Sequence, residues 1–308
     1  MNRSSKPGFT ICKWIVPLLF IRLSLLLTSG VSAQTQERDQ QQWCTYEGKI
    51  GPGVGKHIVF ISGDDEYRSE QPMPMLGKIL AVRHGFKCTV LFAIDPDSGT
   101  IKPNHQTNIP GMEAIDSADL LILGLRFRNL PDDQMKHFVD YHDAGKPMIG
   151  TRTTTHAFNY PKDSTSAYKH FAFNSEDWAG GFGQQVMGNT WVNHHGVHGK
   201  QSSLGIIPDD QKDNLILKGV KDVWGPSDVY GIKRLPETAK VLLKGAVLSG
   251  MSPDDKPIFT IRLQESINHQ HQNAIFSTLF LFPPTLSPLL PILKNWQHFK
   301  TERRLHEL

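Results

Sequence analysis

Apolar and amphipathic segments alternate along the chain from residue 57, and this alternation predicts an α/β fold. Short apolar runs are typical of strands that are buried on both faces. Four such runs cover residues 57–63, 87–95, 118–126 and 146–152. Two segments between them place apolar residues at the spacing of one helix face. This order of strands and helices indicates an open, mainly parallel sheet with helices on both faces.

Both helical segments carry signals that mark their ends. The first, residues 71–84, ends before Gly85. Its expected core face comprises Met75, Leu76, Ile79, Leu80 and His84. The second, residues 130–145, has Pro131 in its first turn and ends at a glycine. Its expected core face comprises Met135, Phe138, Val139 and His142.

Three polar loops are expected to meet at one edge of this sheet. Ligands of open α/β sheets bind beyond the carboxyl ends of the strands. Loops 63–71, 126–131 and 151–160 follow the first, third and fourth predicted strands, and all are rich in charged or hydroxyl side chains. The sequence therefore predicts its functional site at this edge.

The second half of the chain is less regular. A glycine-rich segment, residues 175–191, precedes three runs that are predicted as strands at a mixed edge of the same sheet. These runs cover residues 202–208, 228–233 and 240–248. Residues 274–293 contain no charge and four prolines, which exclude a spanning helix or a central strand. A slip of the reading frame near residue 257 would explain this tail, and resequencing that finds the frame intact would refute it.

The N-terminal residues predict export. A positively charged start, an apolar stretch over residues 14–27 and small residues up to Ala33 are typical of a signal peptide, with release to the periplasm or the medium after cleavage near Ala33. Pro17 and Arg22 interrupt the stretch and disfavour the alternative, a stable membrane span. The expected organisation is a signal peptide (1–33), a linker (34–55), one α/β domain (56–256) and an atypical proline-rich tail (257–308).

Composition narrows the range of partners. The net charge is +3 and the chain has no polybasic run or acidic tail, so neither nucleic acid nor a membrane surface is an expected partner. Cleavage would leave Cys44 and Cys88, which an oxidising compartment would permit to pair. Because Cys88 lies in an apolar run, a buried free thiol is the favoured interpretation. Nothing in the sequence indicates an oligomeric state.

Acidic and basic side chains in the edge loops are candidates for chemistry. Asp64, Asp65 and Glu66 follow the first strand and could supply a general base or a metal ligand; local salt bridges are the alternative. Arg152 follows the fourth strand and could hold a carboxylate or hydroxyl groups, or pair with the acidic loop. His156 follows it and is a candidate ligand or acid–base group, with a structural role as the alternative.

Residues 193–199, NHHGVHG, concentrate His194, His195 and His198 in seven positions. His194 and His198 are four residues apart, but the two glycines of the run disfavour the helix that would align them as a metal-binding pair. The run is therefore expected to form one wall of a polar pocket, and His194 and His198 remain candidate ligands of a divalent metal.

Trp224, Asp228 and Tyr230 combine aromatic rings with a carboxylate within a short segment. Sugars bind through stacking of their C–H faces on aromatic rings together with polar contacts to their hydroxyl groups, so these residue types fit a sugar ligand. The alternative for Trp224 is packing in the core or a loop.

Three segments, residues 61–96, 126–158 and 222–236, resemble the ThuA-like (trehalose utilisation) family, in particular its secreted members. The resemblance covers roughly residues 56–256. It implies a class I glutamine amidotransferase-like fold, with flavodoxin-like topology, and a role in sugar metabolism that includes 3-keto disaccharides. Arg152 stands where that fold carries a nucleophilic cysteine, and an always-cationic arginine excludes cysteine-dependent glutamine hydrolysis.

This chain departs from the family in two places. The family turn after the fourth strand often carries Gly-x-His, whereas here Arg152 stands in the turn and His156 follows later. The family also ends in a further core strand and a helix, and the tail after Pro257 resembles neither.

The leading interpretation is an exported protein that acts on a sugar or a (3-keto) glycoside. Its expected catalytic residues are Asp65, Glu66, Arg152 and His156. Its expected substrate contacts are Tyr67, Arg68, Arg128, Thr153, His194, His195, His198, Trp224, Asp228 and Tyr230. The alternatives are a non-catalytic carbohydrate-binding protein and a metal-dependent hydrolase built on the histidines, and only the last requires a cofactor, a divalent metal.

Overall fold

A computed structural model describes residues 41–232, 234–260, 273–275 and 280–282 of the chain. The chain divides into two compact units, Met1–Gln42 and Trp43–Leu308, and every element named below lies in the second. Within the described ranges, each helix is too short or too polar to cross a lipid bilayer.

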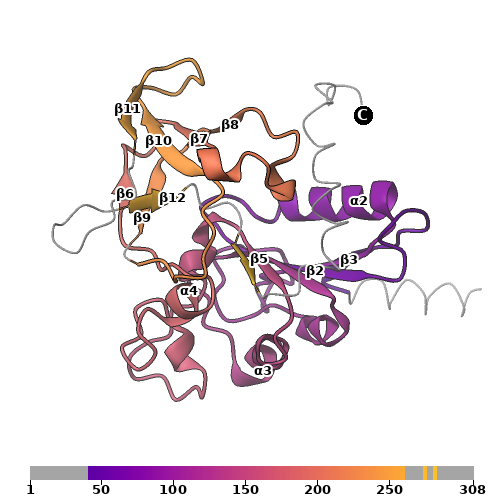
Figure 1. The fold of residues 1–308 in the computed structure, drawn as a ribbon. Coiled ribbons are helices and arrows are strands. Elements are labelled where there is room, and N and C mark those ends of the chain that lie inside the picture. The colour runs from indigo at the N-terminus through magenta and orange to yellow at the C-terminus, as the bar shows by residue number, and fades with distance from the viewer. Residues whose placement is uncertain (1–40, 233, 261–272, 276–279, 283–308) are drawn as a thin grey trace, which may run out of the picture. The chain divides into compact units, whose positions relative to one another are not determined.

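The first sheet has six strands in the order β1-β3-β2-β4-β5-β13 (Figure 1). Its strands are β1 (Trp43–Tyr46), β2 (His57–Gly63), β3 (Lys87–Phe92), β4 (Leu120–Leu125), β5 (Met148–Gly150) and β13 (Phe280–Phe282). Strands β3, β2, β4 and β5 are parallel, whereas β1 and β13 pair antiparallel at the two edges. The four parallel strands coincide with the four predicted apolar runs, and their order is that of flavodoxin-like folds. The predicted α/β class is confirmed.

Helix α2 (Pro72–His84) covers one face of this sheet, but its inward side differs from the predicted one. Leu80 and His84 are buried as expected, whereas Met75 is 52% exposed. Gly77 explains the difference, because a Cβ there would lie only 3.2 Å from Cγ2 of Val90. The helix therefore approaches the sheet along its smallest residue rather than along its most apolar stripe.

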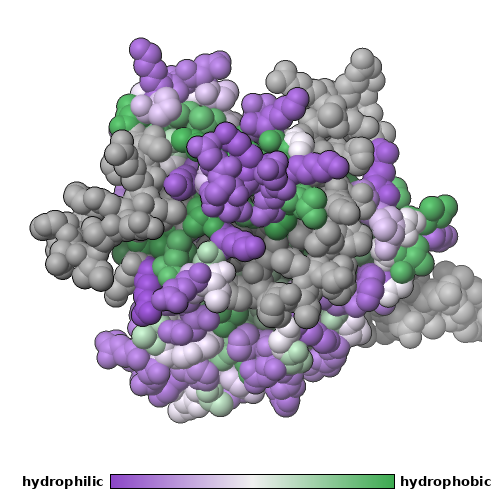
Figure 2. Space-filling view, viewed as in Figure 1, coloured by the Kyte–Doolittle hydropathy of each residue, from purple (hydrophilic) through white to green (hydrophobic). Residues whose placement is uncertain are grey.

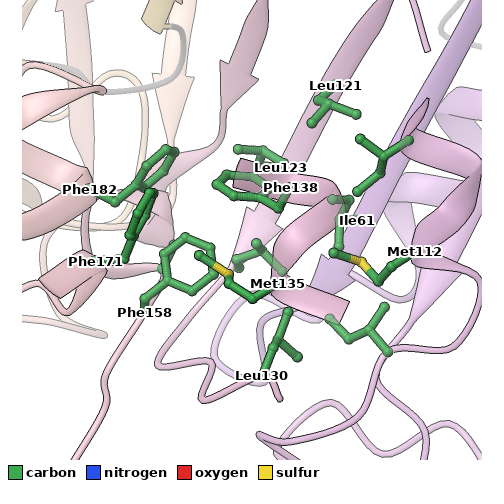
Figure 3. Packing of buried hydrophobic residues seen from close by; sticks show 14 of the residues in the cluster. Ile61, Met112, Leu121, Leu123, Leu130, Met135, Phe138, Phe158, Phe171 and Phe182 are labelled. Atoms are coloured by element: carbon green, nitrogen blue, oxygen red, sulfur yellow. The ribbon is translucent and has the colours of Figure 1, made fainter. Parts of the chain in front are cut away.

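Helix α3 (Asp132–Asp143) packs on the opposite face. Met135 and Phe138 are buried as predicted, and Tyr141 joins them; Val139 and His142, also predicted for the core face, are only partly buried. The ring of Phe138 packs in an aromatic group with the rings of Phe158, Phe171 and Phe182 (Figure 3). The outer side of the helix is polar, and hydrophilic residues dominate the lower part of the surface in Figure 2, where α3 lies.

Short helices fill the connections. They are η1 (Met112–Ser117), η2 (Arg152–His156), η3 (Lys169–Phe171), α4 (Gly181–Gln185), η4 (Asp209–Gln211) and η5 (Leu215–Leu217). Helix η2 begins directly after β5 and therefore occupies the carboxyl edge of the first sheet.

A second, antiparallel sheet contains the remaining strands (Figure 1). They are β6 (His194–His195), β7 (Ser203–Ile206), β8 (Val223–Gly225), β9 (Val229–Ile232), β10 (Lys244–Leu248), β11 (Pro257–Thr260) and β12 (Asn273–Ile275). The order is β6-β9-β12-β10-β7-β8, with β11 also paired to β10. The prediction that these strands extend the first sheet is wrong. They pair antiparallel with one another instead, because loops and single turns connect them in the manner of antiparallel strands.

Segments outside the predicted domain also contribute strands. Strand β1 lies within the expected linker 34–55, and β11 to β13 lie within the expected tail 257–308. The predicted signal peptide, and the proline-rich stretch after residue 282, fall outside the described residues.

The two cysteines of the described chain are free thiols, as the favoured interpretation expected. In the β1–β3 pair, Cys44 lies opposite Val90, and Cys88 lies opposite Tyr46. Burial raises the pKa of Cys88 to about 12, so this thiol is unreactive.

Candidate functional site

The polar loops at the carboxyl edge meet, as predicted. Arg126, at the end of β4, forms ion pairs with both acidic residues after β2: its Nη1 lies 3.2 Å from Oδ1 of Asp65, and its Nε lies 3.0 Å from Oε2 of Glu66. An isolated bridge between Arg128 and Phe158 joins the loops after β4 and β5. Asp65 and Glu66 therefore share one cation, Arg126, at the edge of the sheet.

Asp64 stabilises the turn that carries Asp65 and Glu66. Its buried carboxylate accepts hydrogen bonds from Oγ1 of Thr153 at 2.6 Å and from the backbone N–H groups of Glu66 and Tyr67 at 2.9 and 3.3 Å. Burial raises the pKa of Asp64, and these donors oppose the shift. Thr153 was expected to contact substrate, but it is fully buried and fastens the turn after β5 to the turn after β2.

Arg152, the first residue of η2, points toward the second sheet. Its Nη1 donates to the carbonyl oxygen of Asp228 at 2.8 Å, and its Nη2 pairs with Oδ1 of the same residue. The guanidinium group lies between two aromatic rings, 4.0 Å from the centroid of Tyr230 and 4.9 Å from that of Tyr67. The hydroxyl of Tyr67 in turn lies 3.0 Å from Oγ of Ser227. Hydrogen bonds and stacking together fix the orientation of this arginine.

Asp228 is the centre of the arrangement. Its side chain has no exposed surface, and its second oxygen, Oδ2, lies 2.7 Å from Nδ1 of His194 and 3.5 Å from Nδ1 of His198. A buried carboxylate is stable only when it is compensated, and Arg152 and His194 supply that compensation from opposite sides. We refer to Tyr67, Arg152, His194, Asp228 and Tyr230 as the Asp228 cluster.

Strand pairing brings the histidine run to this place. His194 lies opposite Tyr230 and His195 opposite Val229 in the antiparallel β6–β9 pair. The next residue, Gly196, has a positive φ of 97°, and a Cβ there would lie only 3.0 Å from Cγ1 of Val247. Glycine therefore lets the chain turn where β6 ends, beside Asp228.

Trp191 fixes the protonation of His194. The indole Nε1–H of Trp191 donates to Nε2 of His194 at 3.1 Å. Because an indole N–H cannot accept, Nε2 must carry a lone pair, and the ring proton resides on Nδ1, where it is donated to Asp228. His194 is thus a neutral imidazole in this arrangement.

His156 is buried below the cluster rather than within it. Its ring lies among the rings of Phe127, Phe173, Trp191 and Tyr230. Burial lowers the pKa of His156 to about 3, and nearby cationic groups add to the shift. It was expected to be a catalytic residue, but at 3% exposure it has no access to a ligand and supports the cluster from beneath.

Three other candidates lie outside the cluster. Arg128 is buried and donates to the carbonyl oxygens of Arg126 and His105 at 2.8 and 2.7 Å, so it holds the loop after β4 instead of a ligand. Arg68 points into solvent, 69% exposed, with a positive φ of 53°. Trp224 lies on β8, at the opposite end of the second sheet from β6.

His195 and His198 flank the cluster. His195 is half-buried on β6, and burial lowers its pKa. His198 is 56% exposed and reaches back toward Asp228. Among the described residues, His194, His198 and Asp228 place one metal-ligating atom each within 4.8 Å of one another.

Two cavities lie apart from this cluster. One, of about 440 Å³, is lined by Lys169, His170, Asp177 and Trp178. The other, of about 300 Å³, lies at the start of α3 beside Asp132. The Asp228 cluster is therefore the candidate functional site because of its convergent charged groups and not because of a cavity. Neither of the two cavities contains a comparable group of charges.

Sequence reasoning missed Arg126 and Trp191. Arg126 ends the third predicted strand at the expected edge, and that position was the available signal. Trp191 lies three residues before His194, but only the pairing of β6 with β9 reveals that its indole meets the imidazole.

The chain is similar to a structurally characterised protein of Bacteroides uniformis ATCC 8492 that is provisionally described as thua-like, the family that the sequence resembles. The sequence identity is 13%, the TM-score is 0.44, and the similarity covers 83% of this chain and 95% of that one. No family model matches the chain, and no curated protein matches it. Similarity at this level bears on neither ligand nor reaction, so the α/β class rests on the strand order given above.

Proposed function

We propose that this chain is an exported protein that binds a sugar or glycoside at the Asp228 cluster and acts on it. The observation that carries the proposal is the carboxylate of Asp228, which has no exposed surface and yet holds two partly exposed polar groups, Arg152 on one oxygen and His194 on the other. Buried charges with such partners are concentrated at functional sites.

A sugar fits the chemistry of the groups that reach solvent. Arg152 is 19% exposed, so its guanidinium N–H groups can donate to hydroxyl oxygens, and His194, which is 31% exposed, offers the edge of its ring to the same ligand. The half-buried ring of Tyr67 lies on one side of the guanidinium and offers an aromatic surface for the C–H face of a sugar. The family that the loop segments resemble implies the same class of ligand.

Glu66 is the proposed acid–base group. Its side chain is 24% exposed, and Arg126 keeps it beside the cluster. Glu66 also directly precedes Tyr67, a member of the cluster, in the chain. Arg152 orients the substrate and stabilises developing negative charge.

A non-catalytic carbohydrate-binding protein is the second candidate. The pairing of both Asp65 and Glu66 with one cation, Arg126, favours it, because both carboxylates are then engaged with the protein itself.

A sugar screen with matched variants tests the proposal. Thermal unfolding is followed with trehalose, cellobiose and their 3-keto forms, and the products are analysed. A sugar at about 100 times its Kd should stabilise the protein by about 2.7 kcal/mol. Arg152→Lys should lose this stabilisation, and Arg68→Lys, which changes an exposed arginine outside the cluster, should retain it.

The same screen separates catalysis from binding. Glu66→Gln should bind the sugar and lose turnover. Binding by the wild-type chain without any product identifies the binding protein instead. No stabilisation by any sugar of the panel would contradict the proposal as a whole.

A further inference from the structure

Two imidazoles converge on one carboxylate oxygen. Oδ2 of Asp228 lies 2.7 Å from Nδ1 of His194 and 3.5 Å from Nδ1 of His198. We propose that His194, His198 and Asp228 bind one zinc-type divalent transition-metal ion. Two imidazoles and one carboxylate form a ligand set that suits such an ion.

The distances of the two imidazoles from Asp228 are close to those that a bound ion requires. Ligands about 2.1 Å from a tetrahedral Zn²⁺ lie about 3.4 Å from one another. His198 already lies at this separation from Asp228, and His194 must move away from it by less than 1 Å, roughly the difference between its present hydrogen bond and that spacing. All three ligand atoms lie within 4.8 Å of one another.

The surroundings permit the adjustment and leave a coordination position open. His198 lies between Gly196 and Gly199, both with positive φ, so its backbone can shift at little cost. The side chain of His198 is 56% exposed, which lets water or a substrate oxygen reach a fourth position. Oδ1 of Asp228 remains paired with Arg152, which keeps the ligand carboxylate in place.

Metal binding would have one visible consequence at Trp191. The ion replaces the proton on Nδ1 of His194, and the neutral imidazole then carries its proton on Nε2. In the structure without metal, the indole N–H of Trp191 donates to this same atom, Nε2 of His194. Two N–H groups cannot bond to each other, so the indole must turn away when the ion binds. The emission of Trp191 therefore reports occupancy.

The inference is independent of the sugar proposal, since zinc is titrated with no sugar present. The full chain is freed of metal with a chelator and titrated with ZnCl₂ by calorimetry and by tryptophan fluorescence. Co²⁺ is titrated in parallel, because its visible absorption distinguishes tetrahedral from octahedral coordination.

Matched variants localise the ion. His198→Ala changes an exposed side chain and should leave the fold intact while weakening zinc binding at least about tenfold. His137→Ala is the control: His137 and Asp116 form a 2.8 Å histidine–carboxylate pair elsewhere on the surface. It should bind zinc as the wild-type chain does. Trp191→Phe should bind zinc at least as tightly as the wild type and lose the emission change.

We expect one zinc per chain, with tetrahedral Co²⁺ absorption. No zinc binding by the wild-type chain overturns the proposal. Equal affinity in His198→Ala and the wild type also overturns it, as would an equal loss of affinity in the His137→Ala control.

Discussion

Nδ1 of His194 lies 2.7 Å from the buried Oδ2 of Asp228, while Arg152 occupies the other oxygen of the same carboxylate. The residue before β9 of the second sheet thus presents a charge that is neutralised by the first residue of η2, which follows the first sheet. This carboxylate therefore connects the carboxyl edge of the parallel sheet with the antiparallel sheet. The positions of Arg152 and His194 depend on it.

Removal of the Asp228 charge should destabilise the protein. Asp228→Asn leaves Arg152 without its charged partner, and loss of one member of a buried ion pair costs about 3 kcal/mol or more. Urea unfolding measures the change. Arg152→Met in the same chain should recover part of the loss. The surface variant Asp116→Asn, which breaks the pair with His137, should change stability by less than about 0.5 kcal/mol. A comparable small loss in Asp228→Asn would show that the buried pair contributes little.

Stability should fall in acid because of His156. Its pKa is lowered from 6.5 to about 3 in the folded protein, so between these values the unfolded chain binds more protons than the folded one. Stability therefore decreases as the pH falls below 6.5, by up to about 1.4 kcal/mol per pH unit from this group. His156→Gln should have a shallower dependence between pH 6 and 4 in urea unfolding. Identical slopes in both proteins would contradict the assignment.

Thr153→Val should loosen the turn at Asp64. Valine matches the shape of threonine but removes the donor to Oδ2, which leaves a buried carboxylate oxygen without that hydrogen bond. The expected cost is about 1–3 kcal/mol in the free energy of unfolding. Thr107→Val, at an exposed threonine, is the control and should be nearly neutral. Equal stability of the two variants would disprove the role of Thr153.

Phe138→Ala should be among the most destabilising changes on α3. Its buried ring contacts Phe158 and Phe182 at centroid distances of 5.2 and 5.3 Å. Such a truncation costs about 3–5 kcal/mol. Val82→Ala, on the exposed side of α2, removes a side chain that is 67% exposed and should cost less than about 0.5 kcal/mol. A loss below 1 kcal/mol for Phe138→Ala would show that this core relaxes to fill the space.

The parallel sheet could be predicted because its strands are buried on both faces. Residues of β2 are all buried, so its centre, residues 58–61, appears in the sequence as consecutive apolar residues. The inward faces of the helices were predicted only in part. In α2, a close approach at Gly77 decides which side turns inward, and a hydrophobic pattern contains no information on such tertiary contacts.

Part of the site could be predicted from position alone. Arg152 and the acidic loop follow parallel strands, whose carboxyl ends share an edge. The roles of individual side chains could not be predicted in this way. Arg128 and Thr153 have the residue types of ligand contacts, yet each is buried and bonded to the protein itself. The second sheet, which delivers Asp228 to Arg152, depends on long-range pairing that no local pattern specifies.

Side-chain NMR of ¹⁵N-labelled histidine during a sugar titration tests most directly whether the Asp228 cluster is the binding site. Metal-free protein is titrated with the sugar that gives the largest thermal stabilisation. The account predicts that the ring nitrogens of His194 shift and saturate with the sugar, while those of His137, in its surface pair with Asp116, do not move. Saturable sugar binding that leaves the His194 resonances unchanged would contradict it.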